Sequence, residues 1–441
     1  MSPEPDRRLR YALVGTGARA EMFVRSLVLD YRDSAELVAF ADSNQARMDA
    51  HNAWLEELGR DAVPTYPASD FVTMLSKERV DVVLVTTVDR VHDEYIVAAL
   101  HAGCDVITEK PMTVDVPRCQ RILDAVAQTG RTVRVAFNYR YNPLHERVRQ
   151  VLADGQIGEI GSVHFEWLLD VRHGADYFRR WHRDKANSGG LMVHKASHHF
   201  DLVNWWLNAV PVQVYAAGRL FFYGEPGRRH GYARDYDRAH GEVAAGDPFA
   251  LQLAAHPRLR ALYLEAEAED GYHRDQNVFA PGVTIEDDMS VLASYSTGAT
   301  MTYHLTAYAP WEGYRVMFNG SRGRLELEVV ESDFVSPYAA GELKGAALHG
   351  VQAAVEEGWA KLTVRPFWEQ PRQVPVAGYT RSGHGGADAK MTAALFGGET
   401  DPMGRAATAR DGALALLTGL AANRSFETGQ PVRVADLLTV D

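Results

Sequence analysis

The sequence contains very little cysteine. Only Cys104 and Cys119 occur in 441 residues, and each lies in a stretch whose pattern is typical of ordinary α/β structure. Two such residues cannot build a disulfide framework or a cysteine-based zinc site, so both are excluded. The same scarcity favours a reducing compartment, and we expect a cytoplasmic protein.

Long apolar runs and an excess of positive charge are also lacking. No stretch of about 18 uninterrupted apolar residues occurs, so we predict no membrane span. The 46 Lys and Arg residues are outnumbered by 58 Asp and Glu residues, which gives a formal net charge of −12. Because this balance repels phosphate backbones and anionic membrane surfaces, neither nucleic acid nor a membrane is an expected partner.

The composition is that of a globular protein. Hydrophobic residues make up 46% and charged residues 24%, which excludes a disordered or collagen-like chain. The length exceeds the usual size of one compact core and therefore predicts two domains.

The first third of the chain alternates short apolar runs with helical patterns, which indicates parallel βαβ units. Strands are predicted at 11–14, 36–41, 80–85, 105–108 and 132–137. Helices are predicted between them at 18–30, 44–58, 91–102 and 115–129. We expect residues 1–140 to form a Rossmann-type dinucleotide-binding domain.

The pattern changes after residue 140. Helices are predicted at 143–153 and 195–208, and strands at 163–169, 211–222, 286–297, 300–308, 314–319 and 323–329. Residues 141–441 should then form an α+β domain with a mostly antiparallel sheet and helices on one face. Residues 224–247 and 331–385 look like long loops or insertions.

A glycine turn follows the first predicted strand and opens a helix. Gly15 and Gly17 let the backbone approach a pyrophosphate, whereas Ala20 stands where a third glycine is common. Asp42 ends the next strand, where a carboxylate can bind the ribose hydroxyls of NAD and repel the 2′-phosphate of NADP. We therefore expect NAD rather than NADP. A flavin- or nucleoside-binding fold, or a Rossmann domain that has lost its cofactor, remains the alternative.

Lys110 lies at the carboxyl end of the predicted strand 105–108, between Glu109 and Pro111. Ligands bind beyond the carboxyl ends of parallel strands, so Lys110 is placed beside the expected cofactor. Partial burial would lower its pKa and let it exchange a proton with a substrate hydroxyl. A solvated surface lysine is the alternative.

A cluster of histidines follows the pair Gly189-Gly190. If a helix begins near residue 194, then His194, His198 and Asp201 share one of its faces. A metal could bind the two histidines, but the sequence indicates no third ligand, and we predict no metal site. Packing of three histidines into the core would require a partner for each ring.

Taken together, these residues resemble the Gfo/Idh/MocA oxidoreductase family. The resemblance is carried by Gly15-Thr-Gly17, Asp42, Thr86-Thr87 with His92, Glu109-Lys110-Pro111, Gly189-Gly190, His198 and Asp201. It covers nearly the whole chain and implies a Rossmann domain, then a domain with a large open sheet that forms a homodimer or homotetramer. It implies hydride transfer between NAD(P) and a sugar or cyclitol carbon, with Lys110 as catalytic lysine and His198 as second acid/base residue.

The resemblance and the turn together give a cofactor-binding set. Its members are Gly15, Gly17, Ala18, Arg19, Asp42, Thr86, Thr87, His92, Glu109, Lys110 and Asn138.

One position departs from the family pattern. The family commonly has Asp four residues before the second acid/base histidine, whereas this chain has His194, followed by Lys195. We count His194 as a third catalytic candidate. The exchange makes the pocket more cationic, which suits a sugar acid or an acidic glycoside, although a neutral His194 would equally serve a neutral sugar.

Further residues are candidates for the substrate pocket because aromatic faces pack on sugars while Arg and His bind hydroxyls. They are Arg140 and Tyr141 after the last strand of the first domain, and Tyr177, Trp181, His182 and Arg183 before the glycine pair. All of these except Arg183, together with Lys110, His194, Lys195 and His198, form the predicted substrate set. The segment 270–275 and His384 could also reach the cleft.

The leading hypothesis is an NAD-dependent oxidoreductase that takes hydride from a secondary hydroxyl carbon of a sugar or sugar derivative. An alternative is an NAD-dependent glycoside hydrolase, in which transient oxidation at C3 permits elimination, water addition and re-reduction. A sensor that binds NAD and a sugar without turnover would not need Lys110 and His198 as a proton relay.

Overall fold

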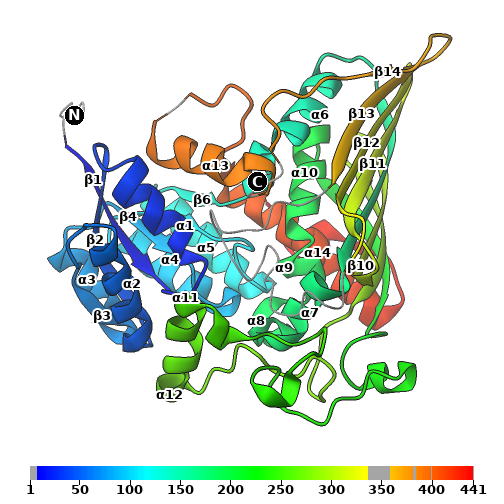
Figure 1. The fold of residues 1–441 in the computed structure, drawn as a ribbon. Coiled ribbons are helices and arrows are strands. Elements are labelled where there is room, and N and C mark those ends of the chain that lie inside the picture. Colours follow the sequence, from blue (N-terminus) through cyan, green and yellow to red (C-terminus); the bar gives the residue numbers. More distant parts are fainter. Residues whose placement is uncertain (1–6, 336–357, 381–383, 399, 441) are drawn as a thin grey trace.

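The computed structural model describes residues 7–335, 358–380, 384–398 and 400–440. Within them the chain forms two sheets, one of seven strands and one of nine, each packed against helices (Figure 1). This confirms the predicted fold class, a Rossmann-like layer followed by an α/β layer with a large, mostly antiparallel sheet.

The first sheet has the order β15-β6-β5-β4-β1-β2-β3. Its bounds are β1 (Leu9–Val14), β2 (Ala35–Asp42), β3 (Thr65–Pro67), β4 (Val82–Val85), β5 (Asp105–Thr108), β6 (Val133–Val135) and β15 (Ala407–Thr408). β1 to β6 pair in parallel, and the strand order reverses at β1, which lies between β2 and β4. The crevice beyond the carboxyl ends of β1 and β4 is therefore the expected ligand site.

Helices cover both faces of this sheet. They are α1 (Ala20–Arg25), α2 (Gln45–Glu57), α3 (Phe71–Lys77), α4 (His92–His101) and α5 (Val116–Thr129). Side chains fix the starts of two of them: the Asn44 side chain accepts from Arg47 N, and that of Asp115 accepts from Arg118 N. The helix predicted at 18–30 begins at Ala20 instead. After Arg25 it continues as a π-helix over Ser26–Asp30.

The second sheet has the order β14-β13-β12-β11-β7-β10-β9-β8-β16. Its bounds are β7 (Ile160–Asp170), β8 (Pro211–Arg219), β9 (Asp288–Tyr295), β10 (Thr300–Ala309), β11 (Glu312–Gly320), β12 (Gly323–Ser332), β13 (Trp359–Pro366), β14 (Arg372–Gln373) and β16 (Val432–Arg433). Every pairing is antiparallel except that of β7 with β10.

Three long helices lie on one face of the second sheet: α6 (Pro143–Ala153), α10 (Ser197–Leu207) and α14 (Ala409–Thr428) (Figure 1). Inward residues such as Leu325, Leu327 and Val329 are buried, whereas Leu292 on the opposite face is half exposed. The predicted arrangement, with helices on one face only, is confirmed.

Several elements differ from the predicted ones. The predicted insertion 331–385 contains β13 and β14, and its residues 336–357 and 381–383 lie outside the described part of the chain. No helix was expected at α7 (Val171–Arg179), α8 (Lys185–Ser188), α13 (Ala387–Phe396) or α14. Helix α14 is apolar nearly all round because it is buried, so it lacks the one-sided pattern of a surface helix.

The helix predicted at 195–208 begins at Ser197, after a separate short helix α9 (Leu191–His194). Gly189 and Gly190, both with positive φ, precede α9 and turn the chain sharply. His194 and His198 therefore do not lie one turn apart on a common helix, and the predicted shared face is wrong.

An irregular region begins near residue 220 and continues to about residue 287, so it is longer than the loop predicted at 224–247. It includes α11 (Pro257–Leu259) and α12 (Glu267–Asp270), which lie against the first layer near α1 and α2 (Figure 1).

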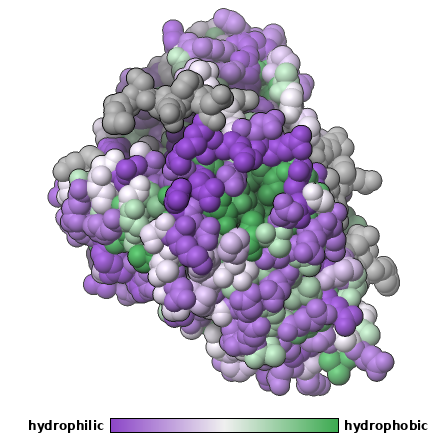
Figure 2. All heavy atoms as spheres, turned by 90° about the vertical axis from the view of Figure 1, so that its left-hand side faces the viewer, coloured by the Kyte–Doolittle hydropathy of each residue, from purple (hydrophilic) through white to green (hydrophobic). Residues whose placement is uncertain are grey.

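On the face shown in Figure 2 most residues are hydrophilic, and hydrophobic ones gather near its middle. None of the helices in the described ranges is long and apolar enough to span a membrane.

Candidate active site

A cavity of about 480 Å³ lies at the carboxyl ends of β1, β2, β4 and β5 and extends to α7, α9 and α10. Residues of the first layer that line it include Gly15, Gly17, Ala18, Arg19, Asp42, Arg47, Thr86, Thr87, Asp89, Glu109, Lys110, Asn138 and Tyr139. Residues of the second layer that line it include His173, Tyr177, Arg180, Trp181, His182, His194, Lys195, His198, Tyr263, Asp270 and Tyr272.

The glycine turn lies at one end of the cavity. A Cβ atom on Gly15 would lie 2.6 Å from the backbone nitrogen of Thr87, so only glycine permits β1 and β4 to end this close together. The carboxylate of Asp42 accepts from Thr16 N at 2.5 Å and from Thr16 Oγ1 at 2.8 Å. Asp42 therefore holds the turn in shape while its charge faces the cavity.

Arg19, Glu109 and Asn138 are joined along one wall. Glu109 accepts from Arg19 Nε at 2.5 Å and from the backbone nitrogen of Lys110 at 3.1 Å. Asn138 Nδ2 donates to Asp388 at 2.7 Å, and Asp388 also lies 3.9 Å from Arg19. These predicted cofactor residues thus fix one another and the backbone of Lys110.

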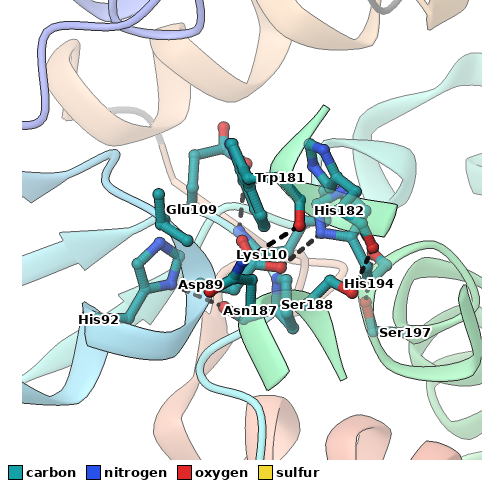
Figure 3. A network of polar contacts seen from close by, with 12 residues as sticks. Asp89, His92, Glu109, Lys110, Trp181, His182, Asn187, Ser188, His194 and Ser197 are labelled. Atoms are coloured by element: carbon teal, nitrogen blue, oxygen red, sulfur yellow. Dashed lines mark hydrogen bonds and ion pairs between the residues drawn. The ribbon is translucent and has the colours of Figure 1, made fainter. Parts of the chain in front are cut away.

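A chain of three polar groups forms the other end of the cavity. Nζ of Lys110 lies 3.2 Å from Nε2 of His194, and Nδ1 of the same ring lies 2.5 Å from Oδ2 of Asp89 (Figure 3). The lysine ammonium also donates to the backbone oxygen of His194 at 3.3 Å. Asp89 follows β4, Lys110 follows β5 and His194 ends α9, so this network joins the two layers of the molecule.

Burial controls the protonation of Lys110, His194 and Asp89. It lowers the pKa of Lys110 to about 8, with the charges of Asp89 and Glu109 opposing this shift and that of Lys195 adding to it. Burial also raises the pKa of Asp89 well above its usual value. The pKa of His194 is lowered well below its usual value by burial and by the nearby Lys110 charge. A lysine that titrates near neutral pH suits proton exchange with a hydroxyl.

His198 lies on the Tyr139 ring, with ring centroids 4.3 Å apart and nearly parallel planes. The Tyr139 hydroxyl accepts from Lys195 Nζ at 3.1 Å. Lys195 also lies over the Trp167 ring, 4.9 Å from its centroid, so its charge is held among aromatic faces. All three cavity residues are nearly buried, so the surrounding side chains limit the positions they can take.

Tyr177, Trp181 and His182 form an aromatic wall beside His194. Trp181 stacks on His182 at 3.6 Å between centroids, and His182 meets the His194 ring edge-on at 4.2 Å. Nδ1 of His182 makes no hydrogen bond to any described residue, so it is available to a ligand hydroxyl. Burial lowers the pKa of His182 well below its usual value, so this ring is neutral.

Several predicted site residues do not line the cavity. His92 is fully buried behind it, between the carbonyl oxygens of Pro111 and Thr87, and therefore positions the loops after β4 and β5. Arg183 is held by backbone carbonyls, including that of Pro281 at 2.9 Å. The side chain of His384 lies outside the described residues.

Arg140, Tyr141 and Asp201 lie in the core rather than at the cavity. Arg140 forms a buried, two-point ion pair with Asp201, at 2.6 and 2.7 Å. Tyr141 is buried within the apolar cluster that contains Phe40 and Met391. Sequence proximity to Asn138 suggested a role for Arg140 and Tyr141, but the 3-10 helix over Asn138–Tyr141 turns these side chains away.

Sequence reasoning missed other cavity residues. Asp89 lies directly beyond β4, and the rule that placed Lys110 beyond β5 could have found it. Tyr139 adjoins the predicted Asn138, and Arg180 lies between the predicted Tyr177 and Trp181. Arg47 and Tyr263 carried no such signal, although the segment 270–275 was expected to approach the cleft, and its Asp270 and Tyr272 do. Among the described residues, no group of three or more His, Cys, Asp or Glu side chains could hold a metal ion.

Models of one protein family match most of the chain. The oxidoreductase family's NAD-binding Rossmann fold (Gfo/Idh/MocA) matches residues 9–137, and its C-terminal alpha/beta domain matches residues 149–434. YteT of Bacillus subtilis (strain 168), which is named as an oxidoreductase, is 33% identical over 436 residues. The match covers 96% of this chain and 97% of that protein. Inositol 2-dehydrogenase of Pseudomonas fluorescens (strain SBW25) is 31% identical over 209 residues, 47% of this chain and 57% of the enzyme.

Solved structures share the fold over nearly the whole length. Aldose-aldose oxidoreductase from Caulobacter crescentus, complexed with glycerol, has a TM-score of 0.62 at 16% identity and covers 97% of this chain and 100% of its own. The WlbA dehydrogenase from Bordetella pertussis, in complex with NADH and UDP-GlcNAcA, has a TM-score of 0.63 at 18% identity and covers 99% and 100%. At sequence identities this low, the similarity shows a shared fold only.

Proposed function

We propose that this chain, which belongs to the Gfo/Idh/MocA oxidoreductase family, transfers hydride between NAD and a secondary hydroxyl carbon of a sugar or sugar derivative. One observation carries the proposal: a single cavity has the glycine turn and Asp42 at one end and the Lys110, His194 and Asp89 chain at the other. The first end suits a dinucleotide, and the second suits removal of a hydroxyl proton.

The residues of the first end fit NAD. When bound, NAD supplies the acceptor for a hydride from the substrate carbon. Gly15, Gly17 and Ala18 would hold the diphosphate, and Asp42 would bind the ribose. Asp42 and Asp270 both face the cavity beside Arg47, whose charge Asp270 already neutralises at 2.7 Å. A 2′-phosphate would meet two carboxylates there, which favours NAD over NADP.

Lys110 would accept the hydroxyl proton as hydride leaves. The same number of protons can be distributed over Lys110, His194 and Asp89 in two ways. In one, the Lys110 ammonium donates to Nε2 of His194, and Nδ1–H donates to ionised Asp89. In the other, the proton has moved along the chain, so that Lys110 is a neutral amine and Asp89 is protonated. The lowered pKa of Lys110 and the raised pKa of Asp89 bring these arrangements closer in energy.

We propose a sugar that carries an acidic group as the preferred substrate. Lys110, Lys195 and Arg180 line the cavity with four histidines, whereas the carboxylates at this end, Asp89 and Glu109, bind protein groups. A relative of the same fold binds UDP-GlcNAcA. His198, Tyr177 and Trp181 would contact the sugar ring, because aromatic faces pack on its C–H surfaces.

The test is to incubate the purified protein with NAD and a panel of sugars, sugar acids and aryl glycosides. NADH is followed at 340 nm while ketosugar and released aglycone are measured in the same samples. NADH and ketosugar in equal amounts in the first turnover are the expected result, and Lys110→Met should form neither. Aglycone release without net NADH would instead establish the redox-assisted glycosidase, and no reaction with any class would overturn the proposal.

We also propose that the open face of the second sheet joins copies of the chain into a homodimer or homotetramer. Tyr215 and Leu292 are cross-strand neighbours on this face and are 45% and 50% exposed. Light scattering after size exclusion should report a dimer or tetramer that Leu292→Glu dissociates. A monomeric wild-type protein would overturn this assignment.

A further inference from the structure

Residues 251–272 of the irregular region lie across the cofactor end of the cavity, and we call them the covering segment. They include α11 and α12, which lie below α1 and next to the lower end of α2 in Figure 1. Their apolar side chains make a small core of their own, which packs on Ala18 of the glycine turn and Ala50 of α2. The segment is thus built against the dinucleotide-binding elements, although it belongs to the second layer.

The segment reaches the glycine turn itself. The backbone nitrogen of Ala18 donates to the Tyr263 hydroxyl at 3.0 Å, and a Cβ atom on Gly17 would lie 3.6 Å from the same hydroxyl. Tyr263, Asp270 and Tyr272 line the cavity together with Gly17 and Asp42. A diphosphate bound at the turn would therefore contact Tyr263 directly.

Arg47 on α2 binds the segment from the opposite side. Its Nε donates to the Leu262 oxygen at 3.1 Å, and its guanidinium pairs with Asp270 at 2.7 Å. It also lies over the rings of Tyr263 and Tyr272, 5.9 and 5.7 Å from their centroids. Arg47 is nearly buried, yet its Nη2 has no hydrogen-bond partner among the described residues. A buried, unsatisfied donor at a cavity wall indicates a ligand acceptor there.

Contacts outside the cavity fasten the segment to α1 and α2. Arg258 donates to Glu21 at 2.9 Å and to the Ala50 oxygen at 2.8 Å, and it lies over the Trp54 ring. Glu269 accepts from the backbone nitrogens of Gln45 and Ala46 at the start of α2. The segment would have to release these contacts to uncover the cavity.

We propose that the covering segment is part of the dinucleotide site and retains the cofactor through many turnovers. Tyr263, Tyr272 and Arg47 form the wall around the diphosphate and adenosine, and the Arg258 and Glu269 contacts keep that wall closed. The proposal rests on the proposed function, since it concerns the same dinucleotide. A retained cofactor must be regenerated in place. The hydride taken from one sugar carbon and the proton taken from its hydroxyl then return to the carbonyl carbon and the carbonyl oxygen of a second sugar.

The experiment measures release of NADH from the whole protein. Protein loaded with NADH is mixed with excess NAD in a stopped-flow instrument, and the loss of bound-NADH fluorescence gives the dissociation rate. Arg258→Ala should release NADH at least about 10-fold faster than the wild type, because affinity changes appear mainly in dissociation. Arg260→Ala is the matched control, because Arg260 lies in the same segment and its one ion pair with a described residue is to Glu265 on the surface.

The outcomes separate the two proposals. Equal dissociation rates for the wild type and Arg258→Ala would overturn the covering role while leaving NAD chemistry intact. Failure of the wild type to bind NADH would overturn both proposals. If Arg258→Ala does not fold, Glu21→Gln removes the other half of the same ion pair and should also speed release, whereas an unchanged rate in that variant counts against the segment.

Discussion

The two ends of the cavity are built in opposite ways. The proton end consists of charged and titratable groups, Lys110, His194 and Asp89, held within hydrogen-bonding distance of one another. The cofactor end combines the backbone of the glycine turn with Asp42, Arg47 and a covering segment fixed by contacts outside the cavity. Under the two proposals, one end would control where a proton resides, and the other would control how the cofactor enters and leaves. Substitutions at the two ends should change different rate constants.

The largest effect is expected at Lys110. Lys110→Met removes the proton acceptor, and we expect kcat to fall about 1000-fold, within the range for loss of general acid–base catalysis. The variant should bind NADH with an unchanged Kd and release rate, because no covering contact is lost. Steady-state kinetics and NADH fluorescence titration check this. A variant with wild-type kcat would show that Lys110 is not the proton acceptor.

Arg140 tests a residue that lies at neither end. Arg140→Met leaves Asp201 buried without its partner, and we expect the free energy of unfolding to fall by about 3 kcal/mol. KM for the sugar should not change, because Arg140 does not line the cavity. Urea denaturation gives the first quantity, and steady-state kinetics the second. A raised KM with unchanged stability would indicate that Arg140 binds the substrate, as the sequence predicted.

Asp89 tests the proton end through its pH dependence. Lys110 loses its charge as the pH rises through about 8, so the rate of sugar oxidation should rise through the same pH and then level off. Asp89→Asn removes a charge that raises the pKa of Lys110, so the midpoint should move below 8, and kcat should fall about 30-fold. The measurement is kcat/KM between pH 6 and 10.

A second substitution at this end should move the profile the other way. Lys195 lowers the pKa of Lys110, so Lys195→Met should shift the midpoint above 8. NADH release should be unaffected in both variants. Midpoints that shift in the same direction in Asp89→Asn and Lys195→Met would contradict the assigned charges.

The smallest effect is expected at the cofactor end. Asp270→Asn frees the charge of Arg47 for a 2′-phosphate, and we expect the affinity for NADP relative to NAD to rise about 5-fold, or about 1 kcal/mol. Fluorescence titration with NADH and NADPH measures the ratio. Glu265→Gln is a control in the same segment, since Glu265 pairs with Arg260 on the surface. An unchanged ratio would mean that Asp270 does not help select NAD.

Local patterns predicted the parts of the site that depend on short stretches of chain. Gly15 and Lys110 each follow a strand and Asp42 ends one, and the rule for parallel sheets placed all three at one cavity. Asp89 meets His194 across 105 residues of sequence, and Tyr263 meets Ala18 across 245, so only tertiary folding brings them together.

The same limit explains the errors in the fold. A helix was expected to run through His194, but the positive φ of Gly189 and Gly190 gives a separate turn first. Arg140 was expected at the cleft because of its neighbours in sequence, whereas its partner Asp201 lies on α10 in the other layer. Helix α14 has no polar face because it is buried between elements distant in sequence.

The most direct measurement of the central claim is a single turnover at several pH values. The protein loaded with one equivalent of NAD is mixed with the sugar acid that the substrate panel selects, and NADH is followed at 340 nm. We expect the wild type to form NADH at a rate that rises through about pH 8, and Lys110→Met to bind NAD but form no NADH. NADH formation by Lys110→Met at the wild-type rate, or none by wild-type protein that binds both ligands, would contradict it.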